Sequence, residues 1–349
     1  LTSYESDHFN RQMTLGAILH DTLGLNPTPN VRVEGGGATG ALAMRTALAY
    51  IESGLCESVL VYGCEKNGRG VSSKTANQLF ALSADVDWEL MVGGTYTGFY
   101  AAMMRAHMDK YGTTEEQFAH VAVRNRYNAQ FNPIAQKPMN ISIDDVMSSR
   151  AIAEPYKLFD CSLLSDGAAC ILLSTEDWAK THSNTYEKRP PVYFTGTGCA
   201  TDTMRLGDRY PDITNFRAKK IASQQAYKMS GIENPLKDID VAELYDSYSG
   251  VEIQAVEDLG FVDEGTGGKA IAEGLFDLDG DLPVNTSGGL LGRGAPVGAT
   301  GILQAIEVIE QLWETVDSQR QVKNAKRGLT DTHAGIASIS VVNIFERRD

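Results

Sequence analysis

The feature that most constrains the fold of this 349-residue sequence is its alternation of short β-branched runs with longer helical segments. Apolar residues recur at helical spacing over residues 42–53 and about 300–313, whereas short apolar runs rich in Val, Ile and Leu are typical of buried strands. We expect strands over residues 58–62, 168–173, from 192 onward, and 336–345. Strands that alternate with helices predict an α/β protein.

A four-residue repeat links the two halves of the chain. Residues 37–40 and 298–301 both read Gly-Ala-Thr-Gly, and each opens a predicted helix. Two unrelated helix starts would explain the match, but the shared strand–helix order favours an internal duplication. Two facing helix N-termini would concentrate backbone N–H groups, which suits an anionic transition state or a thioester oxygen.

The chain divides at a polar stretch over residues 179–191 that ends in two prolines, as linkers do. We therefore expect an N-terminal domain over 1–180 and a C-terminal domain over 190–349. Residues 85–156 show several helical patterns and no clear strand, which predicts a helical cap inserted in the first domain. The sequence starts at Leu1 within an apparently helical region, so we expect the true N-terminus to be missing.

Charge and composition narrow the classes of function. A net charge of −14 disfavours binding to nucleic acid or to an anionic membrane surface. No apolar run approaches the ~20 residues of a membrane span. The five cysteines, without a CxxC pair and with apolar flanks, are interpreted as reduced core residues of an intracellular, cytoplasmic protein. No spacing of Cys and His fits a metal site, and no dinucleotide-binding fingerprint is present.

Four motifs occur in an order that resembles one family. They are VEGGGATGALAM (33–44), CSLLSDGAACILL (161–173), ELYDSYSGVEIQAVEDLGF (243–261) and NTSGGLLGRGAPVGATG (285–301). Together they resemble the sterol-carrier and lipid-transfer thiolases of the thiolase superfamily. This resemblance implies a thiolase fold, with two duplicated βαβαβ-type halves in α/β/α/β/α layers and a helical cap. It also implies that the first strand and helix would precede Leu1.

The sequence departs from that family at its reactive positions. Gly37 stands where the family carries its nucleophilic cysteine. In the HDCF-type motif Tyr245 and Ser247 replace the His and Cys, Asp246 is retained, and Tyr248 replaces the Phe. Ala295 replaces the His of the GHP motif. His333, in a Gly-containing stretch that we expect to be a loop, matches a histidine of the lipid-transfer subclass.

These departures favour chemistry without a covalent intermediate. Gly37 cannot be acylated, and Cys64, the nearest cysteine in sequence, is expected to lie beyond the helix. The pattern is similar to the nucleophile-lacking steroid side-chain aldolases of the lipid-transfer group. That similarity implies retro-aldol cleavage of a β-hydroxyacyl-CoA, which needs a base, an acid and an oxyanion site. Tyr245, Ser247 and His333 are the candidate groups.

Each candidate also has a structural interpretation. Tyr245, with an ordinary phenol pKa near ~10, is a better donor than base, or it only fills the volume of the family's His. Asp246 could orient a neighbour or cap a turn. A histidine's ordinary pKa near ~6.5 suits proton transfer, although His333 could simply be packed.

Substrate contacts are expected from the glycine-rich turns. The predicted CoA-binding positions are Gly37, Gly288, Gly289, Arg293, Gly294 and Ala295, with turn geometry or a surface charge as the alternatives. CoA is part of the substrate, and no other cofactor is expected. The resemblance implies a homodimer joined by a small OB-fold, zinc-ribbon (DUF35-type) partner in a heterotetramer. A thiolase or acyltransferase with another nucleophile, or a non-catalytic subunit, are the alternative functions.

Overall fold

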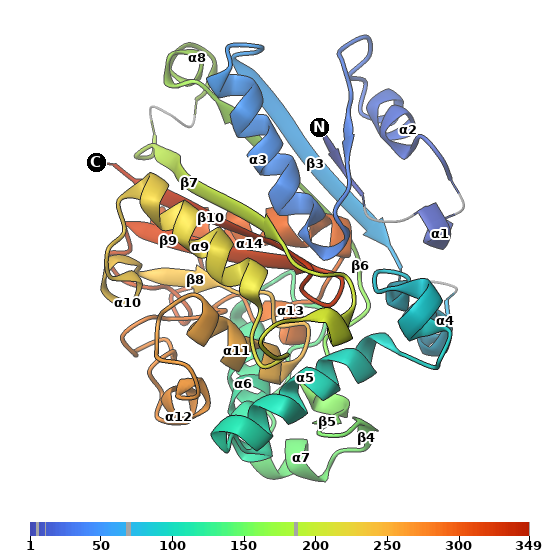
Figure 1. Ribbon diagram of the computed structural model, residues 1–349. Helices are drawn as coiled ribbons and strands as arrows, with labels where there is room; N and C mark the ends of the chain where they lie inside the picture. The colour runs from blue at the N-terminus through green and yellow to red at the C-terminus, as the bar shows by residue number, and fades with distance from the viewer. Residues whose placement is uncertain (5–6, 11, 68–70, 185–187, 349) are drawn as a thin grey trace.

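Two four-stranded sheets organise the protein. The computed structural model describes residues 1–4, 7–10, 12–67, 71–184 and 188–348 (Figure 1). The first sheet has the order β2-β1-β3-β6 and the second the order β7-β10-β9-β8. Their bounds are Thr2–Ser3 (β1), Arg32–Val33 (β2), Ser58–Lys66 (β3), Asp166–Ser174 (β6), Val192–Thr201 (β7), Val241–Glu243 (β8), Arg327–Ala334 (β9) and Ile339–Arg347 (β10). Each sheet mixes parallel and antiparallel pairs.

Two central helices lie between the sheets and carry the repeated Gly-Ala-Thr-Gly segments. Helix α3 (Thr39–Glu52) contacts β3 and β10, and α14 (Val297–Leu312) contacts β3, β6, β8 and β9. The helices cross at Gly40 and Gly301. A Cβ atom on Gly301 would lie 2.6 Å from the Ala41 nitrogen, so glycine is required for this close approach. The two copies of the repeat therefore meet in the core.

Outer helices cover the other faces. Helix α9 (Arg217–Ser230) packs on β7 and β10, and Figure 1 shows it in front of the second sheet. Helix α2 (Leu15–Thr22) covers part of the first sheet, because its His20 hydrogen-bonds the Tyr62 hydroxyl of β3 (2.9 Å). The result is a layered α/β structure, which confirms the predicted fold class.

A mainly helical region occupies the lower half of Figure 1. Helix α6 is its centre and contacts α7, α11, α12 and α13, which come from both halves of the chain. The bounds are Ser73–Ala81 (α4), Tyr96–Tyr111 (α5), Glu115–Asn128 (α6), Ile143–Ser148 (α7), Ser249–Asp258 (α11), Gly267–Ala272 (α12) and Gly289–Gly292 (α13). Three short helices elsewhere are Asp7–Asn10 (α1), Glu176–His182 (α8) and Pro235–Asp238 (α10).

Several local predictions were wrong. The chain opens with strand β1 instead of a helix, and β9 occupies a stretch that was expected to be a loop. The insertion contains a strand, β4 (Ala151–Ala153), which pairs with β5 (Tyr156–Lys157). The last strand begins at Ile339, because residues 335–338 form the turn from β9. The cysteines are free, as predicted, but none is fully buried: Cys170 is exposed and the other four are half-buried, with Cys56, Cys161 and Cys199 packed against the hydrophobic core.

Candidate functional site

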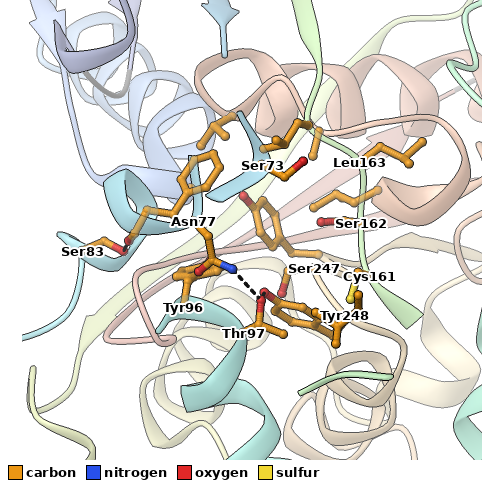
Figure 2. A pocket seen from close by; sticks show the side chains of 18 of the residues that line it. Ser73, Asn77, Ser83, Tyr96, Thr97, Cys161, Ser162, Leu163, Ser247 and Tyr248 are labelled. Atoms are coloured by element: carbon orange, nitrogen blue, oxygen red, sulfur yellow. Dashed lines mark hydrogen bonds between the residues drawn. The ribbon is translucent and has the colours of Figure 1, made fainter. Parts of the chain in front are cut away.

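A cavity of about 340 Å³ lies between α4, the start of α5, the β4–β5 region and the loop after β8. One wall is rich in hydroxyl and amide groups, and the other is apolar. Figure 2 shows these side chains pointing toward a common space. The lining residues are Gly37, Ser73, Asn77, Phe80, Ser83, Tyr96, Thr97, Ile152, Leu158, Cys161, Ser162, Leu163, Leu164, Tyr245, Ser247, Tyr248, Leu290, Ala295, Val297 and Gly335.

Tyr245 occupies the space beside Gly37. A Cβ atom on Gly37 would lie 2.5 Å from the Tyr245 hydroxyl oxygen and would also collide with the His333 carbonyl. Real Cβ atoms do not approach other atoms so closely. Gly37 is buried, just before the N-terminus of α3. A phenol hydroxyl thus stands where a side chain at position 37 would project.

Ser247 presents a buried hydroxyl to the cavity. The residue is only 4% exposed, and no hydrogen-bond partner for its Oγ occurs in the described part of the chain. An unpaired buried hydroxyl costs about 1–3 kcal/mol. Because Ser247 lines the cavity, a bound ligand is the natural partner for this hydroxyl.

His333 lies behind Tyr245 and does not line the cavity. It sits in β9, not in a loop, with its ring centroid 4.6 Å from that of Tyr245. The side chain is fully buried beside Tyr100 and Phe216, and neither ring nitrogen has a partner among the described residues. Burial, reinforced by Lys219 and Arg209, holds the pKa of His333 well below its usual value. His333 is therefore a neutral, packed imidazole.

Asp246 is turned away from the cavity. Its carboxylate accepts hydrogen bonds from the backbone nitrogens of Leu290 (2.6 Å) and Leu291 (3.2 Å) and from Nδ2 of Asn125 (2.9 Å). Burial, followed by the charge of Glu252, raises its pKa. The three donors make Asp246 the anchor of α13, which carries the cavity residue Leu290.

The glycine-rich turn at the start of α13 packs against other parts of the protein and does not line the cavity. A Cβ on Gly288 would meet the Ala129 backbone, and one on Gly289 would meet the Asp246 carboxylate. These two glycines let α13 pack closely, and neither lines the cavity. Of the predicted binding residues, only Gly37 and Ala295 line it.

Arg293 is neither a surface charge nor part of the lining of this cavity. Its side chain is 2% exposed, and Nη1 lies 3.3 Å from Oε2 of Glu243 and 3.1 Å from the Ser287 hydroxyl. With Gly294 it borders a second cavity, between 134–136, 164–168 and the start of α14. Glu243 pairs with Nη1 alone, and Nε and Nη2 have no partner among the described residues, so the contact of Arg293 with a CoA phosphate stays a prediction.

Cys161 is a cavity thiol that sequence reasoning missed. Its Sγ donates to the Lys157 carbonyl (3.3 Å), and burial together with Asp160 raises its pKa to about 12. Burial and then Glu65 raise the pKa of Cys64 to about 11, and Cys64 does not line the cavity. Since a thiolate is the nucleophilic form, neither cysteine is activated.

Among the described residues, no group of three or more His, Cys, Asp or Glu side chains could hold a metal ion. None of the helices in this part of the chain has both the length and the apolar character that crossing a membrane requires.

Comparisons with known proteins agree with this architecture. Residues 198–347 match the family model described as Thiolase C-terminal domain-like. The chain is 42% identical over 339 residues to an acetyl-CoA acetyltransferase of Methanothermobacter thermautotrophicus, covering 97% of this chain and 85% of that protein. The chain belongs to the thiolase superfamily.

Other relatives place it among the thiolases of the sterol-carrier type. It is 33% identical over 339 residues to sterol carrier protein 2 of Bos taurus, covering 95% of this chain and 61% of that protein. The structure titled Ltp2-ChsH2(DUF35) aldolase superposes with a TM-score of 0.80 at 26% identity, covering 98% of this chain and 86% of that chain. The predicted family and subclass are confirmed.

Within this thiolase fold, the predicted site residues divide into two groups. Gly37, Tyr245, Ser247 and Ala295 meet at the cavity, whereas Asp246, His333, Gly288, Gly289, Arg293 and Gly294 do not line it. Sequence reasoning missed Asn77 and Thr97, which come from segments without a recognised motif, and Cys161, which opens the motif over 161–173 but was not singled out there. Tyr248 was noted from the sequence only because it replaces the Phe of the HDCF-type motif. The hydroxyl that Tyr adds to Phe was the feature that could have indicated a place in the cavity wall.

Proposed function

We propose that this thiolase-family protein is an enzyme that acts on acyl-CoA, as a carbon–carbon lyase that cleaves a β-hydroxyacyl-CoA by a retro-aldol reaction. The observation that carries the proposal is the Tyr245 hydroxyl in the space that a side chain on Gly37 would need. An acyl-enzyme requires a nucleophile at such a position, whereas a retro-aldol reaction requires only proton transfer and stabilisation of an enolate oxygen.

The proposed reaction conserves protons. The β-hydroxyl loses its proton, the Cα–Cβ bond breaks, and its electron pair forms the thioester enolate while the β-carbon becomes a carbonyl. Protonation of Cα gives the shortened acyl-CoA. The two proton transfers are coupled in the proposal: Tyr245 donates its proton to Cα as the Cα–Cβ bond breaks and takes the proton of the substrate hydroxyl in its place, while the Ser247 hydroxyl supplies a further hydrogen bond. The aldolase named above is a structural neighbour, which supports this choice.

Acyl transfer is the second candidate. Relatives named acetyl-CoA acetyltransferase favour it, as does the presence of the Cys161 thiol in the cavity wall. The raised pKa of Cys161 argues against it, because only a trace of thiolate exists near neutral pH. A non-catalytic subunit is a third candidate, and it predicts binding without turnover.

Partners are also part of the proposal. Strand β6 pairs with β3 on one side in the described structure, and its exposed face includes Cys170 and Leu172. Strand β6 is an edge strand of the first sheet, and a second copy of this chain could pair with it there. The name of the structural neighbour, Ltp2-ChsH2(DUF35) aldolase, includes a DUF35 protein, so we propose a DUF35-type protein as the second component of a heterotetramer in the cytoplasm. Light scattering of the mixed components would measure this stoichiometry.

The deciding experiment is mass spectrometry of products from a panel of tertiary β-hydroxyacyl-CoA thioesters, without free CoA and with the small partner present. The lyase predicts a ketone plus a shortened acyl-CoA. We expect Tyr245→Phe to lower kcat about 10²–10⁴-fold, while Tyr210→Phe, at a tyrosine that is 79% exposed, leaves it unchanged. Turnover only with added CoA, or an acyl adduct lost in Cys161→Ser, would establish acyl transfer instead.

A further inference from the structure

A chain of hydrogen bonds runs along the polar wall of the cavity. Nδ2 of Asn77, on α4, donates to Oγ1 of Thr97 (3.2 Å), at the start of α5. Oγ1 of Thr97 lies 2.9 Å from the Tyr248 hydroxyl, in the residue before α11. All three residues line the cavity, and Figure 2 shows them drawn together there. Three separate elements thus contribute one connected set of polar groups.

Tyr248 is the fixed end of this set. Its ring stacks on Tyr156 with centroids 5.0 Å apart and tilts against Tyr100 at 5.1 Å. Burial keeps the pKa of Tyr248 well above its ordinary value, so the hydroxyl keeps its proton. The related motif has Phe at this position, so packing alone does not require the hydroxyl. The Tyr248 hydroxyl, hydrogen-bonded to Thr97, extends the polar wall.

Asn77 is the open end. Because its Nδ2 donates to Thr97, its Oδ1 is left as an acceptor, and this buried atom has no partner among the described residues. The hydroxyl of Ser247, which lines the same cavity, is the other unpartnered buried oxygen of this wall. Native proteins leave few such groups unpaired without a ligand or water to satisfy them. The Oδ1 of Asn77 needs a hydrogen-bond donor.

The apolar side chains of the cavity determine the chemical character of the ligand. Ile152, Leu158, Leu163 and Leu164 line the cavity from the β4–β5 side and from the segment before β6. These four side chains fit hydrocarbon and give no hydrogen bonds, and the neighbouring Ser162 adds a single hydroxyl to this side of the cavity. A ligand that satisfies both walls is an apolar chain that carries a hydroxyl group on one side.

We propose that Asn77, Thr97 and Tyr248 form a subsite for a hydroxyl group carried by the acyl chain beyond its β-carbon. The substrate class is therefore a hydroxylated acyl-CoA, in which the distal hydroxyl donates to Oδ1 of Asn77. This inference rests on the proposed action on acyl-CoA, but it does not require the retro-aldol step.

The test measures equilibrium binding by calorimetry with ligands that have no β-hydroxyl and cannot be cleaved. The probes are octanoyl-CoA and its 4-, 6- and 8-hydroxy derivatives, with the 6-oxo derivative as a carbonyl control. We expect one hydroxy isomer to bind about 3–10-fold more tightly than octanoyl-CoA, as one neutral hydrogen bond provides. The 6-oxo ligand, which cannot donate, should show no such gain.

Two variants assign the effect. The preference is the Kd of octanoyl-CoA divided by the Kd of the best hydroxy isomer. Asn77→Leu should reduce this ratio to about one, and Tyr248→Phe should reduce it while leaving the ring packing intact. Gln78→Leu, at an exposed amide on the same helix, should leave it unchanged. Equal binding of octanoyl-CoA and every hydroxy isomer, or a preference that survives in Asn77→Leu, overturns the subsite. A hydroxyl preference without cleavage of any β-hydroxyacyl-CoA supports the subsite and overturns the lyase, and cleavage without the preference does the reverse.

Discussion

The Tyr245 hydroxyl oxygen lies 2.5 Å from the position that a Cβ atom on Gly37 would take. The phenol and a side chain at position 37 therefore exclude one another. The carbonyl oxygen of His333 closes the same space from the backbone. The absence of a nucleophile at position 37 is thus part of the packing of the site, and restoring a cysteine there would require Tyr245 and β9 to move.

Gly37→Ala tests this packing. We expect the variant to lower the free energy of unfolding by about 1–3 kcal/mol, the usual cost of overpacking, as measured by urea denaturation. Tyr245→Ala loses buried packing of its own, but Gly37→Ala should cost less in that background than in the wild type, and still something, because the His333 carbonyl remains. Gly207→Ala is the control, since nothing lies within 4 Å of a Cβ there. Equal stability of Gly37→Ala and Gly207→Ala would contradict the close approach.

Ser247 and Ser249 form a natural comparison, because both are buried and only Ser249 has a partner, the Asp160 carboxylate at 2.7 Å. Ser249→Ala should cost about 1–3 kcal/mol of unfolding free energy, since it leaves Asp160 without this bond. Ser247→Ala should keep or slightly raise the stability and yet weaken acyl-CoA binding about 3–10-fold. Denaturation and calorimetry on both variants measure the two effects. A Ser247→Ala protein with unchanged binding would remove Ser247 from the site.

Sequence patterns predicted the two central helices and the longer apolar strands better than the short strands and β9. The helices over 39–52 and 297–312 were anticipated from their apolar periodicity, β3 and β6 from short apolar runs, and β7 only from its start at Val192. Strands β1, β2 and β8 have two or three residues, too few to show a period. Strand β9 reads Arg-Gly-Leu-Thr-Asp-Thr-His-Ala, and its buried polar residues conceal it. Tertiary partners, such as Lys219 for Asp331 (2.6 Å), are what make that strand stable.

The site residues that lie in recognised motifs were predicted from the sequence. Those that reach the cavity only through tertiary contacts were missed. Gly37, Tyr245 and Ser247 were found as departures from a family pattern, and they share the cavity. The same pattern could not reveal that Asp246 points the other way, because adjacent residues in an irregular loop project in different directions. Asn77 lies in a short amphipathic helix whose sequence also fits an ordinary surface helix, and Thr97 lies in a helix whose Met and aromatic residues predict core packing.

Asp246→Asn separates an anchoring role from a catalytic one. The amide offers one acceptor oxygen where the carboxylate accepts three hydrogen bonds, so the hold on α13 weakens. We expect a loss of about 1–3 kcal/mol in unfolding free energy and a raised KM, because α13 carries Leu290 into the cavity. Steady-state kinetics on the cleaved thioester should show kcat within about threefold of the wild type. A large fall in kcat at unchanged KM would return Asp246 to the catalytic groups.

His333 should make the protein sensitive to acid. Its pKa is lowered by burial and by Lys219 and Arg209, so the folded protein does not take up a proton that the unfolded chain binds near its ordinary pKa of ~6.5. The stability contributed by the neutral imidazole is therefore complete above this pH. It is lost as the pH falls, by up to about 1.4 kcal/mol per pH unit.

His333→Phe should remove this acid dependence. Because neither ring nitrogen has a partner among the described residues, a phenyl ring of similar shape gives up no hydrogen bond and should be nearly neutral at pH 8. Urea denaturation between pH 5 and 8 should show the variant gaining on the wild type as the pH falls below ~6.5. His182→Phe, at an exposed histidine, should follow the wild type. Parallel curves for wild type and His333→Phe would mean that the folded protein protonates His333 at its ordinary pKa, and the imidazole would again be available for proton transfer beside Tyr245.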